Sequence, residues 1–199
     1  MSAKSARSDA EGTKPEASRP SMPPEYGIHA PTEGRGILPW TWAAERLAAA
    51  RGYWLATTRP DGRPHVAVVW GVWLRDRYYF ATSVASRKGR NLAANPRCVV
   101  CPEDTAEAVI LEGITEAVTD RAAIERFSVA YATKYAEEID TGLFQVYCVR
   151  PLVVFATLSD AEQFPTTATR WRFADTADSA PEEGVQSPTS ERGNGAAGG

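Results

Sequence analysis

The sequence predicts an α+β protein that is predominantly β, a small barrel of six or seven strands with short helices between them. Apolar and polar residues alternate with the period of a pleated strand in several short segments, and residues 78–83 show this clearly. Turn signals separate these segments. At Asp61-Gly62, glycine supplies the positive φ that a tight hairpin loop requires.

The first half of the domain is expected to begin with a helix and to continue as an antiparallel meander. Thr41 is placed to cap a helix over residues 42–51, and Gly52 marks its end. Turns at 59–63 and 75–77 then join three strands. These strands are expected at residues 53–58, 64–74 and 78–83.

The second half is expected to contain two further helices and the remaining strands. A short basic helix follows Ser86, and Thr119 or Asp120 caps a longer helix that runs to Tyr135. Pro151 interrupts the apolar pattern and separates two strands. The later strands are expected at residues 97–101, 108–118, 143–149, 152–158 and 169–173.

Length and composition predict one packed domain between two tails. The chain has 199 residues, of which 43% are hydrophobic and 24% are charged. Residues 1–36 and 174–199 are rich in Ser, Pro, Gly and charged residues, so they cannot bury enough apolar surface to offset the entropy of ordering. We therefore expect disordered tails there, with His29 in the first, and a folded domain over residues 37–173.

Charge and hydropathy exclude several classes of partner. The formal net charge of −3 argues against a nucleic-acid binder, whose domain would normally be basic. The sequence contains no apolar run long enough for a membrane span and no apolar segment typical of a signal peptide. We expect a cytoplasmic protein that binds neither nucleic acid nor a membrane.

The segment between residues 78 and 100 is the strongest candidate for a binding site. A hydroxyl-rich strand end at Thr82 and Ser83 precedes Ser86, which can cap a helix carrying Arg87, Lys88 and Arg90 in its first turn. Asn95-Pro96 ends this helix. Hydroxyls, a helix start and clustered cations suit a phosphate or another anion. The alternative interpretation is a solvated basic helix between two strands.

Motifs of the common catalytic and metal-binding classes are missing from the sequence. It contains no G-x-G-x-x-G, P-loop, G-x-S-x-G or H-E-x-x-H pattern. His65 is the only histidine between residues 37 and 173, and it is more typical of a turn or edge residue than of a catalyst. The acidic residues 103, 104 and 107 are typical of a solvated loop. The sequence is also rich in tryptophan and tyrosine. These residues either fill the core of a small barrel or bind a flat cofactor ring.

The cysteines favour reduced thiols over a disulfide framework or a metal site. Cys98 and Cys101 match the C-x-x-C pattern, but residues three apart on a strand point to opposite faces. No second Cys or His pair accompanies them, and Cys148 is the third cysteine. We therefore expect neither a zinc site nor a thiol-redox pair.

Three motifs resemble the pyridoxamine 5'-phosphate oxidase-like split β-barrel family, which binds FMN or the deazaflavin F420. They are Leu55-Ala-Thr-Thr-Arg-Pro-Asp-Gly-Arg-Pro-His-Val66, Tyr79-Phe-Ala-Thr82 and Ser86-Arg-Lys-Gly-Arg-Asn-Leu-Ala-Ala-Asn-Pro-Arg97. The resemblance spans about residues 40 to 173, with the motifs in the family's order. It implies a split β-barrel and a homodimer with two cofactor sites at the subunit interface.

The resemblance also implies which residues hold the cofactor. The strand His65, Val66, Ala67 and Val68 would run along the edge of the ring, and Thr82 and Ser83 would lie at the phosphate end. The phosphate would be held by Arg87, Lys88 and Asn91. Trp171 and Arg172 are the candidates for completing the partner's site, with an edge strand and a surface arginine as the alternative. Lys134 is the only other lysine in the domain.

The expected function is an oxidoreductase that passes hydride between F420, or alternatively FMN, and a small conjugated or heteroaromatic substrate. True pyridoxamine phosphate oxidases carry a C-terminal substrate-binding segment that this chain lacks, which disfavours vitamin B6 oxidation. The arginine-rich composition favours the deazaflavin. A non-catalytic cofactor carrier or sensor and an FMN-dependent oxidase-like enzyme remain as alternatives. Haem binding is a less well supported alternative, because His65 is the one axial-ligand candidate in the domain.

Overall fold

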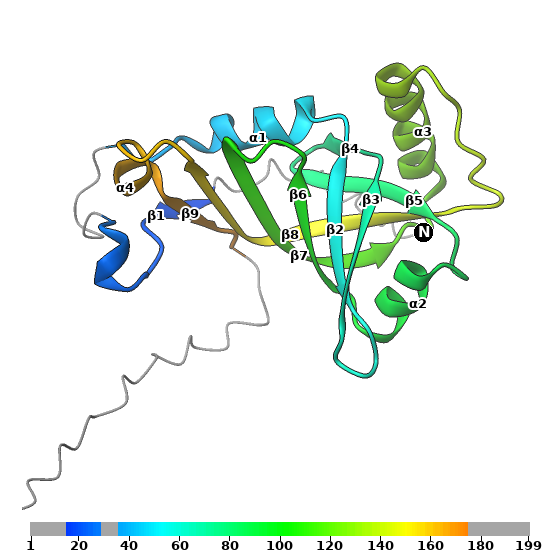
Figure 1. Ribbon diagram of the computed structural model, residues 1–199. Helices are drawn as coiled ribbons and strands as arrows, with labels where there is room; N and C mark the ends of the chain where they lie inside the picture. The colour runs from blue at the N-terminus through cyan, green and yellow to red at the C-terminus, as the bar shows by residue number, and fades with distance from the viewer. Residues whose placement is uncertain (1–14, 29–35, 175–199) are drawn as a thin grey trace, which may run out of the picture.

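The computed structural model describes residues 15–28 and 36–174 as a single antiparallel sheet that helices flank on several sides (Figure 1). The strands follow the order β1-β9-β8-β7-β6-β2-β3, and β5 joins β8 while β4 joins β5. The strands are β1 Glu16–Ser18, β2 Tyr53–Thr58, β3 Pro64–Val69, β4 Gly71–Leu74, β5 Arg77–Thr82, β6 Arg97–Pro102, β7 Glu107–Ala117, β8 Gln145–Leu158 and β9 Thr169–Arg172. The helices are η1 Pro24–Tyr26, a 3-10 turn, and α1 Trp40–Ala49, α2 Arg87–Ala94, α3 Arg121–Tyr135 and α4 Phe164–Thr167.

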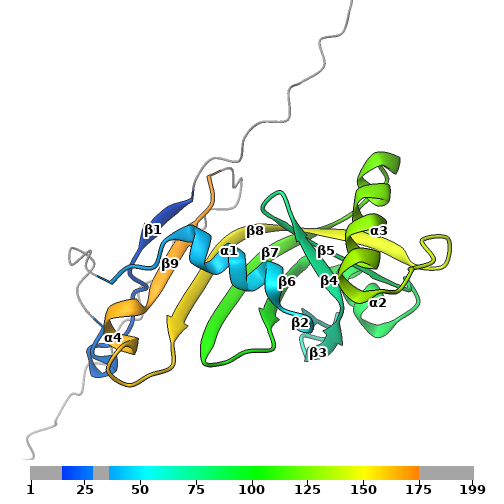
Figure 2. The same cartoon turned by 90° about the horizontal axis from the view of Figure 1, so that it is seen from above.

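The core consists of two clusters of buried residues, one enclosed by the curved sheet and α1, and one between the sheet and α3. The larger cluster is built around fully buried rings of β2, β5 and β9, and α1 closes it through Trp40 and Leu47. A second cluster lies where Phe127 and Tyr131 of α3 pack against Val72 and Val146 of the sheet. Figures 1 and 2 show α2 and α3 at one end of the sheet, and β9, α4 and β1 at the other.

Local signals placed several turns and caps correctly. Gly62 has φ of 84°, and Arg59 and Arg63 close the predicted hairpin with a backbone hydrogen bond of 2.9 Å. Asp120 caps α3, because its carboxylate accepts from the backbone N–H groups of Ala122 and Ala123. The predicted cap at Thr41 is wrong. The helix α1 begins at Trp40, whose ring packs on those of Trp171 and Phe173 and draws the helix start toward the core.

Two predicted strand boundaries also differ in the structure. Residues 64–74 form two strands, because β3 pairs with β2 while β4 turns away to pair with β5. Trp70 lies at the break between them. Conversely, residues 145–158 form one strand through Pro151, and an irregularity of pairing at Glu112 and Gly113 accommodates the missing N–H.

Part of the predicted N-terminal tail is structured. Within segment 1–36, residues 16–18 form β1, which pairs with β9 and extends the sheet. The buried Arg19 guanidinium donates to the carbonyl oxygens of Thr166 and Ala168, the latter at 3.1 Å. Tertiary pairing therefore orders a segment whose composition alone indicates disorder. His29 and residues 175–199 of the predicted C-terminal tail lie outside the described residues.

Candidate functional site

The basic helix α2 is fixed directly onto the end of β5. As predicted, Ser86 is its N-cap, and its hydroxyl accepts from the N–H of Gly89 at 3.0 Å. The same hydroxyl lies 3.2 Å from that of Thr82. A Cβ on Gly89 would approach the carbonyl oxygen of Ser83 to 2.5 Å, so only glycine allows this approach. The helix start and the strand end form one rigid unit.

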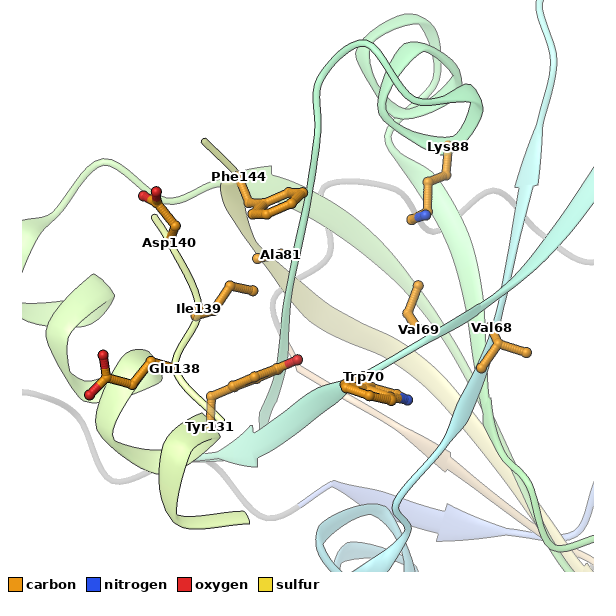
Figure 3. A pocket seen from close by; sticks show the side chains of 10 residues that line it. All are labelled: Val68, Val69, Trp70, Ala81, Lys88, Tyr131, Glu138, Ile139, Asp140 and Phe144. Carbon is orange, nitrogen blue, oxygen red and sulfur yellow. The ribbon is translucent and has the colours of Figure 1, made fainter. Parts of the chain in front are cut away.

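A pocket of about 500 Å³ lies beside this unit (Figure 3). Its walls come from the end of β3, from β5, from α2 and α3, and from the loop after α3. The lining residues are Val68, Val69, Trp70, Ala81, Lys88, Tyr131, Glu138, Ile139, Asp140 and Phe144. Figure 3 shows Lys88 reaching in from α2 on one side, and Tyr131, Ile139 and Phe144 on the opposite side. Lys88 is the one cation in this lining, Glu138 and Asp140 are its two carboxylates, and the other seven residues are apolar or aromatic.

Several residues implied by the family resemblance lie together near this pocket. Lys88 and Val68 line it, and Ala67 and Val66 continue along β3 with Val66 exposed. Arg87 is exposed in the first turn of α2. Thr82 is buried, and the hydroxyl of Ser83 accepts from the N–H of Ala85 at 3.2 Å. Thr82 and Ser83 therefore shape the helix start, and any contact they make with a ligand stays a prediction.

Asn91 does not line the pocket in the structure. Its side chain is fully buried, and its amide nitrogen donates to the hydroxyl of Thr57 at 3.0 Å. That hydroxyl also lies 3.3 Å from Nδ1 of His65. Asn91 therefore supports β2 and β3 from the protein interior, and it has no exposed surface with which to hold a phosphate. A polar residue is usually expected at the surface, so nothing in the sequence indicated that Asn91 is buried.

Trp171 and Arg172 lie far from the pocket. Their strand β9 stands at the opposite end of the sheet from α2 and α3 (Figures 1 and 2). Trp171 is fully buried, and its ring centroid lies 5.6 Å from that of Trp40. A ring enclosed by its own subunit cannot complete a site in a partner. Arg172 is exposed and faces Glu16 in the register of β1, and its role in completing a partner's site stays a prediction. Trp171 is therefore a core residue.

Three positive charges act on His65, which lies near the hairpin end of β3. Burial lowers the pKa of His65 below its usual value of 6.5, and the positive charges of Arg59, Lys88 and Arg87 lower it further. The neutral imidazole is therefore favoured in the folded state. Its contribution to stability is present above pH 6.5 and is lost as the pH falls through the folded-state pKa. The same positive field attracts an anion to this corner.

The pKa of His65 is expected to depend on the charge of Lys88. In an NMR pH titration of its ring protons, we expect a pKa below 6.5 that rises in Lys88→Ala, because one repelling charge is removed. Inorganic phosphate bound beside Lys88 is expected to raise the same pKa. Arg121→Ala, on the surface of α3, serves as the control and should leave it unchanged. An identical His65 pKa in Lys88→Ala would show that the two groups do not interact.

A hydrogen-bonded network holds the pocket wall at Trp70, and sequence analysis missed it. The backbone N–H of Gly71 donates to the hydroxyl of Tyr135 at 3.0 Å, and this hydroxyl lies 2.9 Å from the carbonyl oxygens of Gly71 and Arg51. Lys134 donates to Gly71, to Ala48 and to the hydroxyl of Tyr53. Burial lowers the pKa of Lys134 to about 8. Lys134 is thus a structural residue, and it does not line the pocket.

Removing the hydroxyl of Tyr135 is expected to destabilise the protein. In Tyr135→Phe the buried N–H of Gly71 loses its partner, so the free energy of unfolding should fall by about 1–3 kcal/mol in urea titrations. Tyr26→Phe is a matched control, because Tyr26 is exposed and its hydroxyl has no hydrogen bond to any described residue. Equal stability of Tyr135→Phe and the wild type would mean that water satisfies Gly71.

The acidic loop and the cysteines do not form a catalytic group in the described residues. Glu103 accepts from the backbone of Arg51 and Gly52, and Glu107 forms a bidentate ion pair with Arg46. Both carboxylates therefore bind α1 or the residues that follow it. As predicted, Cys98 and Cys101 lie on opposite faces of β6, and burial raises the pKa of Cys98 to about 11. Within the described ranges, no three His, Cys, Asp or Glu residues are grouped as a metal site.

Comparison with known proteins identifies a family and a set of similar folds. Residues 42–165 match the family model described as Pyridoxamine 5'-phosphate oxidase. No curated protein is similar enough in sequence to count as a match. None of the helices described in the structure is long and apolar enough to cross a membrane.

Three solved structures illustrate the similarity of the fold. A conserved hypothetical protein from Mycobacterium tuberculosis matches with a TM-score of 0.53 and 22% identity, over 59% of this chain and 83% of that one. A haem-binding protein from Mycobacterium smegmatis matches with a TM-score of 0.52 and 22% identity, over 60% and 55%. A putative 5-nitroimidazole antibiotic resistance protein from Bacteroides thetaiotaomicron matches with a TM-score of 0.52 and 12% identity, over 69% and 87%.

Proposed function

Because the chain belongs to the pyridoxamine 5'-phosphate oxidase family, and its sheet is the split β-barrel of that family, we propose that it is a flavin-type oxidoreductase. The cofactor is F420, with FMN as the alternative. The reaction transfers hydride between this cofactor and a small conjugated or heteroaromatic substrate. The observation that carries the proposal is the pocket, which combines one cation on a capped helix with a mainly apolar and aromatic wall, and which has its two carboxylates, Glu138 and Asp140, on the side away from Lys88 (Figure 3).

The residues of the pocket fit a flat ring with a phosphate. Lys88 enters the pocket and would hold the phosphate through a charge-assisted hydrogen bond, while Arg87 adds positive potential from the same turn. Val68 presents apolar surface to the cofactor ring. Residues 65–68 would run along the ring edge with their backbone groups. The bound cofactor supplies the hydride chemistry, and the chain supplies position and electrostatics.

No side chain of the pocket is needed as an obligatory acid or base. The pocket opens to solvent, which can supply the proton that accompanies hydride transfer. The chain's own contribution is then orientation of the two rings and exclusion of water from between them. Trp70, Tyr131 and Phe144 enclose the space in which such rings would lie (Figure 3).

We further propose that the protein is a homodimer. The outward face of β2, β3 and β7 exposes Trp54, Val66, Val68 and Ile110, each to 40% or more. Trp54 lies opposite Val68 in the β2–β3 register, so their side chains share one face of the sheet. A contiguous exposed apolar face marks an interaction surface. A second copy packed there would bring its own residues close to the pocket, because Val68 belongs both to the face and to the lining.

Titration of the purified chain with F420 and, separately, with FMN tests this function. We expect saturable binding that quenches the fluorescence of either cofactor, tighter for F420. Reduced cofactor and a panel of conjugated acceptors then test turnover. Binding of either cofactor without turnover would favour a non-catalytic carrier or sensor. Tighter binding of FMN would favour the oxidase-like alternative, and absence of binding by both would contradict the proposal.

Haem binding is a second candidate function. The haem-binding protein from Mycobacterium smegmatis shares the fold, and His65 lies at the surface end of β3 with its Nδ1 near the hydroxyl of Thr57. The positive field around His65 suits haem propionates as well as a phosphate. A Soret band that appears on addition of haemin and is lost in His65→Ala would support haem over the flavin-type cofactor.

A further inference from the structure

Trp70 occupies a special place in the backbone. It is the one residue between β3 and β4, at the point where the chain leaves its pairing with β2 and joins β5. A tryptophan side chain is usually well buried, yet Trp70 is 49% exposed, and its surface contributes to the wall of the pocket (Figure 3). Core packing therefore does not explain its size.

The ring of Trp70 is held in a fixed orientation. It is stacked on the ring of Tyr135, with centroids 5.4 Å apart and an interplanar angle of 13°. Tyr135 is anchored in turn by the backbone of Gly71 and Arg51. A Cβ on Gly71 would meet the hydroxyl of the buried Tyr78 at 2.4 Å, so the backbone next to Trp70 is packed directly against the core. One face of the indole is thus occupied by Tyr135, and the ring is ready to receive a ligand without reordering.

We propose that Trp70 is the stacking platform for the substrate, and that it selects flat, electron-poor conjugated rings. This inference rests on the proposed function for the identity of the hydride donor. An indole face is electron-rich, so it attracts an electron-poor ring more strongly than an electron-rich one. Tyr131 and Phe144 bound the same space from the other side and restrict its occupant to a flat shape.

The electronic preference agrees with the chemistry of hydride transfer. A ring that accepts hydride must be electron-poor, because the hydride brings its bonding electron pair to a ring carbon. The reduced cofactor loses two electrons and one hydrogen in this step, and a proton from solvent completes the reduced product. Trp70 takes no part in the bond changes, so it is a positioning residue that acts on substrate affinity.

Equilibrium dialysis with a quinone probe tests the platform. The probe is 2,3-dimethyl-1,4-naphthoquinone, whose methyl groups block addition of thiols, and the comparison is electron-rich 1,4-dimethoxy-2,3-dimethylnaphthalene. We expect the wild type to bind the quinone more tightly. Trp70→Leu should weaken quinone binding by about three- to tenfold, and Trp70→Phe by less, because a smaller aromatic face remains. Tyr26→Leu removes an equally exposed aromatic ring outside the pocket and should have no effect.

The outcomes separate this inference from the proposed function. Titration of Trp70→Leu with F420 and FMN is expected to give wild-type cofactor affinity, which would assign Trp70 to the substrate. Loss of cofactor affinity equal to the loss of quinone affinity would overturn that assignment. Wild-type quinone affinity in Trp70→Leu, or equal affinity for the two probes, would also overturn it. If neither cofactor binds the wild type but quinone binding still depends on Trp70, the proposed cofactor fails and the platform stands.

Discussion

Trp171→Ala is expected to lower the free energy of unfolding by about 3–5 kcal/mol, because a fully buried indole is removed from the larger core cluster. Its ring packs edge-on against Trp40 at the end of the sheet opposite the pocket. Urea unfolding at fixed protein concentration measures the change. The concentration is held constant because the stability of a dimer depends on it.

Trp171→Phe provides the control for this prediction. The indole N–H of Trp171 is buried and has no hydrogen-bond partner among the described residues, so phenylalanine removes an unsatisfied group together with part of the ring. We expect a loss well below that of Trp171→Ala. If Trp171→Ala instead kept its stability and lost cofactor affinity, the ring would belong to a binding site and its assignment to the core would be wrong.

Lys88→Ala is expected to weaken binding of F420 or FMN by about 1.5–3 kcal/mol, or roughly ten- to hundredfold, through loss of a charge-assisted contact with the phosphate. Fluorescence titration measures the change in Kd. Lys88 is half-buried on a surface helix, so its removal should leave stability nearly unchanged.

Arg90→Ala is the matched control on the same helix. The guanidinium of Arg90 donates to the carbonyl oxygen of Ala85 at 2.9 Å, and the residue does not line the pocket. Its removal deletes the same charge from α2 without touching the lining. Equal weakening in Arg90→Ala and Lys88→Ala would indicate a diffuse field, and equal affinity of Lys88→Ala and the wild type would remove Lys88 from the site.

Features that depend on a few neighbouring residues were predictable from the sequence. The cap at Ser86, the cap at Asp120 and the hairpin at Asp61-Gly62 each depend on local hydrogen bonds or on one φ angle, and the structure confirms them. Alternation of apolar residues likewise located most strands. The capped basic helix indicated a cluster of Arg87, Lys88 and Arg90, the family resemblance implied a phosphate ligand among them, and the structure brings Lys88 to the pocket.

Features that depend on distant partners were not predictable in this way. The break at Trp70 exists because β3 and β4 pair with different strands, and β1 exists because β9 lies beside it. Trp171 stands between two arginines, so its pattern is typical of an exposed edge, yet the packing of α1 buries it. Asn91 is polar on a polar helix, and only the position of Thr57 shows why it faces inward.

The most direct test of the central claim, that Lys88 binds the cofactor phosphate, is a double-mutant cycle on the ligand and the protein. The affinities of FMN and of riboflavin, which lacks the phosphate, are measured for the wild type and for Lys88→Ala. The corresponding pair for the deazaflavin is F420 and its phosphate-free chromophore. We predict that the wild type prefers the phosphorylated form and that Lys88→Ala loses most of this preference. The same preference in both proteins would show that the phosphate binds elsewhere, and would contradict the site.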